Sequence, residues 1–115
     1  MPHVYSVVLV TVPDSKTADS IAGTLLEEKL AACVNQVPGV KSSYWWEDKI
    51  NYAEEILLLI KTQASLMPRV IECVRKNHPY TMPEIISLPI DEGDKPYLDW
   101  IKSSTHAPRP SRAAK

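Results

Sequence analysis

Two apolar runs, the first nearly continuous and the second of five consecutive residues, constrain the fold of this chain more than any other feature. The first extends from Val4 to Val12 and is ended by Pro13 and Asp14, and the second extends from Ile56 to Ile60. Apolar runs of this length are typical of strands that are buried on both faces. The sequence therefore predicts a sheet whose central strands are covered from both sides.

Two amphipathic helices are predicted between the strands. Residues 15–30 carry apolar side chains at helical spacing, and Asp14 is their expected N-cap. Residues 65–77 repeat this pattern, with Ser65 as the expected N-cap and Pro79 just beyond the expected end. Each helix therefore joins two predicted strands.

A long hairpin is predicted between the two helices. Residues 31–46 and 50–61 favour extended structure, and the few residues between them include Asp48, which tolerates a positive φ. Pro38 and Gly39 interrupt the first of these strands and predict a bend or bulge. The two strands should pair in antiparallel fashion.

The remaining elements complete one α/β domain with a βαββαβ order. Residues 84–90 predict a fourth strand, and residues 97–101 predict a short terminal helix. The domain should span residues 1–105, followed by a disordered tail over residues 106–115 that lacks an apolar period. Right-handed crossovers place both helices on the same side of an antiparallel sheet. The other side then exposes an apolar face, which predicts that another subunit covers it.

Composition argues against several classes of partner and location. The chain has 115 residues and a formal net charge of -1, so it offers no basic field for nucleic acid or anionic lipid. No apolar run approaches the ~20 residues of a membrane helix, and the N-terminus lacks a signal pattern, so a cytoplasmic location is expected. The two cysteines, Cys33 and Cys73, are expected to stay reduced.

Eight short motifs occur in an order that resembles the CutA family of divalent-cation tolerance proteins. They are Val10–Asp14, Glu28–Asn35, Val37–Gly39, Tyr44–Glu47, Ile60–Thr62, His78–Tyr80, Pro83–Ile86 and Tyr97–Trp100. The resemblance implies a ferredoxin-like fold in a homotrimer similar in architecture to PII signalling proteins. It also implies a cytoplasmic protein that binds Cu²⁺ or another divalent cation, with no obligatory cofactor and no catalytic role.

The resemblance also implies two sets of site residues. The metal candidates are His78, Cys33 and Glu84, and the candidates for a ligand or inter-subunit cleft are Lys61, Tyr80 and Trp46. Imidazole and thiolate are the donors that copper and zinc favour. Some family members carry a cysteine where this chain has Val10, a histidine where it has Asn77, and a glutamate where it has Thr81. Two soft donors of those members are therefore absent here.

Each candidate also has a simpler structural interpretation. His78 ends a predicted helix and can bond the backbone, while Cys33 lies in an apolar run where a small buried side chain packs well. Lys61 can extend its ammonium group from a buried strand to water. Trp45 and Trp46 are adjacent on a strand, so their side chains point to opposite faces and favour core or interface packing.

Three other functions compete with metal binding. A trimer of PII-like architecture could act as a scaffold that binds a small anion or a partner protein in its inter-subunit clefts. An N-terminal Pro2 could act as a general base, as in small trimeric tautomerases, but no nucleophile or oxyanion arrangement accompanies it. RNA-binding domains share the βαββαβ order, yet this chain has no phenylalanine and no matching sheet motif.

Overall fold

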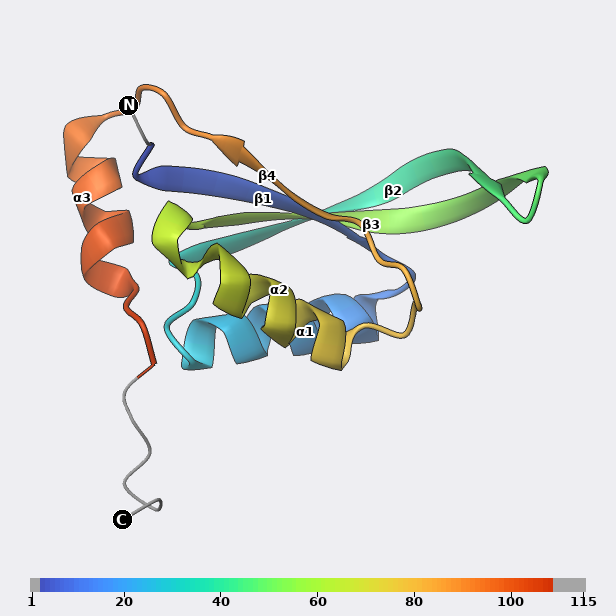
Figure 1. Ribbon diagram of the computed structural model, residues 1–115, viewed down its shortest axis with the longest axis horizontal. Coiled ribbons are helices and arrows are strands. Elements are labelled where there is room, and N and C mark those ends of the chain that lie inside the picture. Colours follow the sequence, from blue (N-terminus) through green and yellow to red (C-terminus); the bar gives the residue numbers. More distant parts are fainter. Residues whose placement is uncertain (1–2, 109–115) are drawn as a thin grey trace, which may run out of the picture.

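The computed structural model describes residues 3–108, and its elements follow the predicted βαββαβ order with a further helix at the end (Figure 1). Four strands form one antiparallel sheet in the order β2-β3-β1-β4: β1 (Tyr5–Val12), β2 (Cys33–Trp46), β3 (Lys49–Gln63) and β4 (Ile85–Pro89). The helices are α1 (Ser15–Glu27), α2 (Met67–Asn77) and α3 (Lys95–Ser104), with a 3₁₀ turn at Ala64–Leu66. The predictions about Pro2 and about residues 109–115 fall outside the described part.

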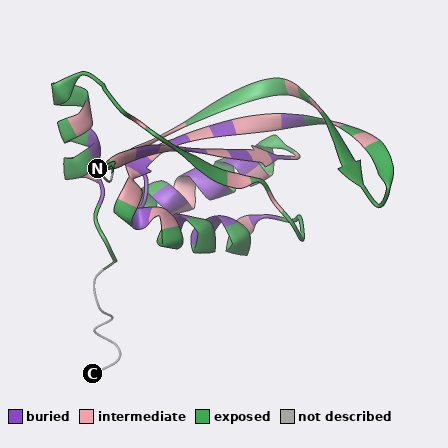
Figure 2. Cartoon of the chain, turned by 45° about the horizontal axis from the view of Figure 1, so that its top comes forward, coloured by how far each residue is buried: buried purple, intermediate pink, exposed green. Residues whose placement is uncertain are grey.

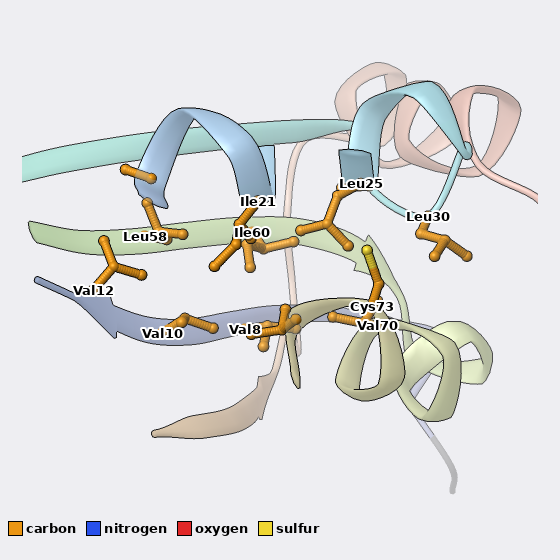
Figure 3. Close-up of a cluster of buried hydrophobic side chains, with 13 residues drawn as sticks. Val8, Val10, Val12, Ile21, Leu25, Leu30, Leu58, Ile60, Val70 and Cys73 are labelled. Carbon is orange, nitrogen blue, oxygen red and sulfur yellow. The ribbon is translucent and has the colours of Figure 1, made fainter. Parts of the chain in front are cut away.

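The hydrophobic core lies between the sheet and helices α1 and α2 (Figure 3). Alternate residues of β1 are buried because successive side chains of a strand point to opposite faces. The largest apolar side chains of this layer are Val8, Val10, Val12, Leu58 and Ile60 from the sheet and Ile21, Leu25, Val70 and Val74 from the helices. Each contributes roughly 1.5–3 kcal/mol relative to an exposed position.

The two helix starts differ in how well the sequence predicts them. Asp14 caps α1 as expected, because its Oδ1 accepts a hydrogen bond of 2.8 Å from the backbone N–H of Thr17. The predicted N-cap role of Ser65 is wrong. Ser65 lies within the 3₁₀ turn, and α2 begins at Met67 without a side-chain cap. Pro68 explains the shift, since its fixed φ and missing N–H suit the first turn of a helix.

The irregular positions of the β2–β3 hairpin match the predictions. Glu47 and Asp48 form the turn with φ values of 52° and 61°. The register shifts between Val37 and Val40, where Gly39 has a φ of 72°. A positive φ is accessible to glycine without strain, which explains why the bulge lies here.

The outer part of this hairpin, residues 41–54, extends past the end of β1 and is called here the hairpin arm (Figure 1). It has no third strand and no helix beside it, and most of it is exposed (Figure 2). Its exposed large side chains are Tyr44, Trp45, Trp46, Ile50 and Tyr52. Because a two-stranded hairpin is at best marginally stable in water, the arm is a structural feature that a single copy leaves unsupported.

Helix α3 closes one end of the sheet. Its Ile101 is fully buried, and Gln63 on β3 donates hydrogen bonds from Nε2 to Thr105 Oγ1 at 2.9 Å and to the Thr105 carbonyl at 3.1 Å. The backbone N–H of His106 donates to the Lys29 carbonyl at 3.1 Å. The end of the domain is thereby tied to the segment after α1. None of the helices within residues 3–108 has the length and apolar character needed to cross a bilayer.

Candidate functional site

The face of the sheet opposite helices α1 and α2 is called here the open face. The strand register places fifteen side chains on it: Tyr5, Val7, Leu9, Thr11, Cys33, Asn35, Val37, Val40, Glu55, Leu57, Leu59, Lys61, Gln63, Ile86 and Leu88. Several of its apolar residues stay exposed, including Ile86 at 51% and Leu88 at 48%. Glu55 is the only acidic member and Lys61 the only basic member. They therefore mark the two ends of an otherwise neutral surface.

Near one end, the loop between α2 and β4 brings together what we call the Glu55 group: Glu55, His78, Tyr80 and Glu84. His78 is buried and bonds through both ring nitrogens. The backbone N–H of Tyr80 donates to Nδ1 at 3.2 Å, so Nδ1 is the acceptor and Nε2 carries the proton. Nε2 then donates to the Thr11 carbonyl at 2.8 Å. His78 is therefore a neutral imidazole that fastens the loop to β1.

The sheet register explains why Thr11 needs this partner. Strand β4 pairs with β1 only as far as Val10, so Thr11 lies just beyond the last residue paired on that edge. A buried backbone carbonyl without a partner is unfavourable, and the imidazole supplies the missing donor. In this arrangement neither nitrogen of His78 has a free lone pair. A metal could bind Nδ1 only after the Tyr80 N–H bond had broken.

Tyr80 extends the same loop to β3. Its hydroxyl donates to Glu55 Oε2 at 3.0 Å, and its ring lies 4.7 Å from the His78 ring, centroid to centroid. Partial burial, followed by the hydrogen bond to Glu55, raises the pKa of Tyr80 to about 12. Tyr80 is therefore a neutral donor at physiological pH and holds the carboxylate in place.

Glu84 stands at the start of β4, close enough to respond to the charge of Glu55. Loss of water around its carboxyl, and then the negative charge of Glu55, raise the pKa of Glu84. The residue as a whole is exposed, so the effect of desolvation on the carboxyl is only partial. Glu55 itself is 6% exposed. The Glu55 group therefore places two carboxyl groups near the Tyr80 hydroxyl.

Near the other end of the open face lies what we call the Lys61 group: Cys33, Asn35, Lys61 and Tyr97. Cys33 is the cross-strand partner of Lys61. Both Lys61 Nζ and Cys33 Sγ donate to Asn35 Oδ1, the latter at 3.7 Å. Burial, and then the neighbouring Cys33, raise the pKa of Tyr97 on α3. Lys61 is thus held by a neutral amide, with no carboxylate of the described chain within ion-pair distance.

A single chain brings together only part of the predicted site. His78, Glu84 and Tyr80 share the Glu55 group, whereas Cys33 lies in the Lys61 group. Trp46 is at the tip of the hairpin arm, opposite Lys49. Within residues 3–108, no three His, Cys, Asp or Glu side chains are close enough to hold a metal ion. The predicted metal set of His78, Cys33 and Glu84 is therefore not assembled inside one copy.

Sequence reasoning missed two residues that organise these groups. Glu55 receives the Tyr80 hydroxyl, and Asn35 receives both donors of the Lys61 group. Strand alternation could have identified Glu55, because it shares a face with Leu57, Leu59 and Lys61. No comparable signal indicated Asn35, whose role depends on its cross-strand neighbours.

Cys73 lies apart from both groups. It borders a hollow of about 200 Å³ between α1 and α2, on the opposite side of the sheet from the open face. Burial, and then the charge of Glu28, raise the pKa of the Cys73 thiol. A thiol with a raised pKa stays protonated and is a poor metal ligand, so Cys73 packs as a small apolar side chain.

Comparisons with known proteins converge on one family. The family model described as CutA1 divalent ion tolerance protein matches residues 6–104. The divalent-cation tolerance protein CutA of Thermus thermophilus is 50% identical over 99 residues, which cover 86% of this chain and 96% of that protein. A solved structure of the Thermus thermophilus divalent cation tolerance protein superposes with a TM-score of 0.87 at 49% identity, covering 89% of this chain and 99% of that one.

A plant relative is equally similar but longer. The chloroplastic protein CutA 1 of Oryza sativa subsp. japonica is 52% identical over 99 residues, which cover 86% of this chain. Those residues cover 56% of the rice protein, so this chain spans little more than half the length of that relative.

Proposed function

This chain belongs to the CutA1 family of divalent ion tolerance proteins, and on that premise we propose that it acts as a homotrimer that binds a divalent cation, with Cu²⁺ the first candidate. The observation that carries the proposal is the family match over residues 6–104. The matched segment includes the Glu55 group, the Lys61 group and the hairpin arm. Divalent-cation tolerance is the property named for the relatives, and direct cation binding is the simplest way for so small a domain to provide it.

The exposed surfaces support assembly of several copies. The open face leaves Ile86 and Leu88 about half exposed, and the hairpin arm exposes Trp45 at 72% and Tyr52 at 77%. Exposed apolar side chains in such number are typical of an interaction site. A second copy that packs on the open face and the arm would bury both. The order β2-β3-β1-β4 with two helices on one face is the basis for the ferredoxin-like and PII-like parts of the proposal.

The cation site we propose is completed between copies. Within the Glu55 group, Glu55 and Glu84 supply oxygen atoms, and His78 supplies a nitrogen once Nδ1 releases the Tyr80 N–H. Cys33 lies near the other end of the same face, so it would have to come from another copy. A borderline or soft cation such as Cu²⁺ prefers nitrogen and sulfur donors, which makes the His78 and Cys33 contributions decisive.

The test is a calorimetric titration of Cu²⁺ into reduced, untagged protein that carries His3→Ala, with the mass measured in the same buffer. His3 is exposed near the N-terminus and would otherwise bind copper adventitiously. His78→Ala is the key variant, and His106→Ala is its matched control, because His106 is an exposed histidine outside both groups.

We expect a trimer that binds Cu²⁺ in a fixed ratio per subunit or per trimer, with affinity lost in His78→Ala and retained in His106→Ala. A trimer with only weak binding of no fixed stoichiometry would contradict the metal site. Equal affinity in both histidine variants would show that His78 is no ligand.

A second candidate function is a scaffold or signalling trimer that uses no physiological metal. The observation that favours it is the bonding of His78, whose two nitrogens are already engaged with Tyr80 and Thr11. On this hypothesis the inter-subunit clefts bind a small anion or a partner protein. A thermal-shift screen against nucleotides and simple anions separates the two candidates, because only the scaffold hypothesis predicts stabilisation that persists in the presence of a chelator.

A further inference from the structure

The open face carries two charges of opposite sign that have no ionic partner in one copy. Within residues 3–108 the single ion pair is Lys95 with Asp99 on the exposed surface of α3. Glu55 is held only by the Tyr80 hydroxyl, and Lys61 only by the Asn35 amide. The cross-strand rows between and around them are apolar or uncharged. Both charges therefore lack an ionic partner within residues 3–108, and the nearby Glu84 carboxyl adds negative charge beside Glu55.

These two charges cannot neutralise each other within one copy. They lie on the same strand, six residues apart, and at about 3.3 Å per residue this separation is about 20 Å. An ion pair requires the charged atoms to approach within hydrogen-bonding distance. Since neither group has another ionic partner within residues 3–108, we look for that partner on a second copy of the chain.

One oxygen of Glu55 is available for such a partner. Oε2 accepts from Tyr80, whereas Oε1 forms no hydrogen bond within the described chain. Because no fully buried polar side-chain atom of the described residues lacks a partner, Oε1 must reach the surface. Lys61 is half-buried, and its long side chain can reorient from Asn35 toward a neighbour.

We propose that Lys61 of one copy forms an ion pair with Glu55 of the neighbouring copy when the open face is covered. This inference rests on the assembly proposed above and specifies how it is aligned. Covering the face removes water from both charges, which is strongly unfavourable unless they are paired. The separation of the charges along β3 then fixes the register, because packing must bring the Lys61 end of one sheet to the Glu55 end of the next.

Charge exchange is the direct test, with mass in solution as the measurement. Lys61→Glu and Glu55→Lys each place like charges at the contact, so we expect each to dissociate at concentrations where the wild type is assembled. The combined variant Glu55→Lys/Lys61→Glu restores opposite charges in every copy, and we expect it to assemble again. Lys16→Glu and Glu27→Lys are matched controls on the exposed surface of α1, and they should leave the mass unchanged.

The charge-reversed variants could misfold, so a double-mutant cycle with uncharged replacements provides a second test. For Glu55→Gln, Lys61→Met and their combination, the apparent dissociation constant should show a coupling of about tenfold to a hundredfold, as found for close charge pairs between proteins. Far-UV circular dichroism confirms that each variant is folded. The same cycle with Lys41→Met in place of Lys61→Met should show additive effects, because Lys41 lies on the hairpin arm.

The possible outcomes separate this inference from the proposed assembly. An assembled wild type with additive effects of Glu55→Gln and Lys61→Met would overturn the ion pair and leave the trimer standing. Coupling of Glu55 to Lys41 would replace Lys61 as the partner. Stabilisation by inorganic phosphate that disappears in Lys61→Met would assign Lys61 to an anion instead. A monomeric wild type would contradict the assembly itself.

Discussion

The two faces of the sheet are built from the same strands, yet one is fully packed in a single copy and the other leaves apolar side chains partly exposed. On the helix-covered face, Leu58 and Ile60 are fully buried by α1 and α2, and every buried polar side-chain atom has a partner. On the open face, Leu57 and Leu59 from the same strand are only partly buried. One face is complete in a single copy and the other is not.

The covered face carries the side chains that stabilise one copy, whereas the open face carries side chains that a second copy would satisfy. Side chains on the covered face are selected for packing within the domain, so they are apolar or carry a hydroxyl that reaches a carbonyl, as Thr62 does with Leu30 at 2.6 Å. The open face retains an unpaired Glu55 and an unpaired Lys61 among apolar neighbours. Within residues 3–108 these charges form hydrogen bonds to neutral groups but no ion pair, so a second surface could supply their ionic partners.

Truncation of adjacent leucines on β3 tests the difference between the two faces most directly. Leu58→Ala removes a fully buried side chain from the covered face and should lower the free energy of unfolding by about 2–5 kcal/mol. Leu59→Ala removes the same atoms from the open face and should mainly shift the mass toward the monomer. Urea unfolding and sedimentation measure the two effects. If Leu59→Ala left the mass unchanged at every concentration, the open face would not be an interface.

A smaller loss of the free energy of unfolding is expected for substitutions in the loop between α2 and β4. His78→Ala leaves the Thr11 carbonyl and the Tyr80 N–H without partners, and it should lower the free energy of unfolding by about 2–3 kcal/mol. Tyr80→Phe removes one hydroxyl that bonds Glu55 and should lower it by about 1 kcal/mol. Urea unfolding at neutral pH measures both. A smaller effect of His78→Ala than of Tyr80→Phe would show that His78 does not fasten the loop.

The raised pKa of Tyr80 gives this loop a defined pH dependence. Because the pKa in the folded protein is about 12 and the ordinary value is 10.0, the contribution of Tyr80 to stability is complete below pH 10. It is lost as the pH rises through 12. The stability difference between wild type and Tyr80→Phe should therefore shrink across this range. A difference that stays constant would contradict the hydrogen bond to Glu55.

The sequence predicted the fold because local signals and tertiary packing agree. The turn at Asp48, the bulge at Gly39 and the cap at Asp14 each follow from the conformational preference of one residue. Ser65 failed as a cap because Pro68 fixed the start of α2 more strongly than the serine hydroxyl did. Predictions of this kind succeed where one residue dominates and fail where two nearby signals compete.

The candidate site was harder to predict because it depends on contacts between distant segments. His78 was identified from a motif, but its bond to Thr11 joins residues 67 positions apart in sequence. Cys33 and His78 were both predicted as metal ligands, and the structure places them near different ends of the open face, so they could share a metal only between copies. The spacing of residues along the chain predicts which side chains share a face of one helix or one strand. It carries no information about which ends of a sheet two loops will reach.

The smallest expected effect concerns Glu84, and it has the opposite sign to the others. The pKa of Glu84 is raised by loss of water and by Glu55, so its ionised form is less favourable in the folded protein than in the unfolded chain. Its favourable contribution exists below pH 4.5, the ordinary value, and is lost as the pH rises through the pKa in the folded state. At neutral pH, Glu84→Gln should therefore stabilise the fold. Because the residue is exposed and screened, the gain should be at most about a few tenths of a kcal/mol. Urea unfolding at neutral and acidic pH, with Glu92→Gln as the exposed control, measures it. A gain that persisted below pH 4.5 would rule out repulsion from Glu55 as its cause.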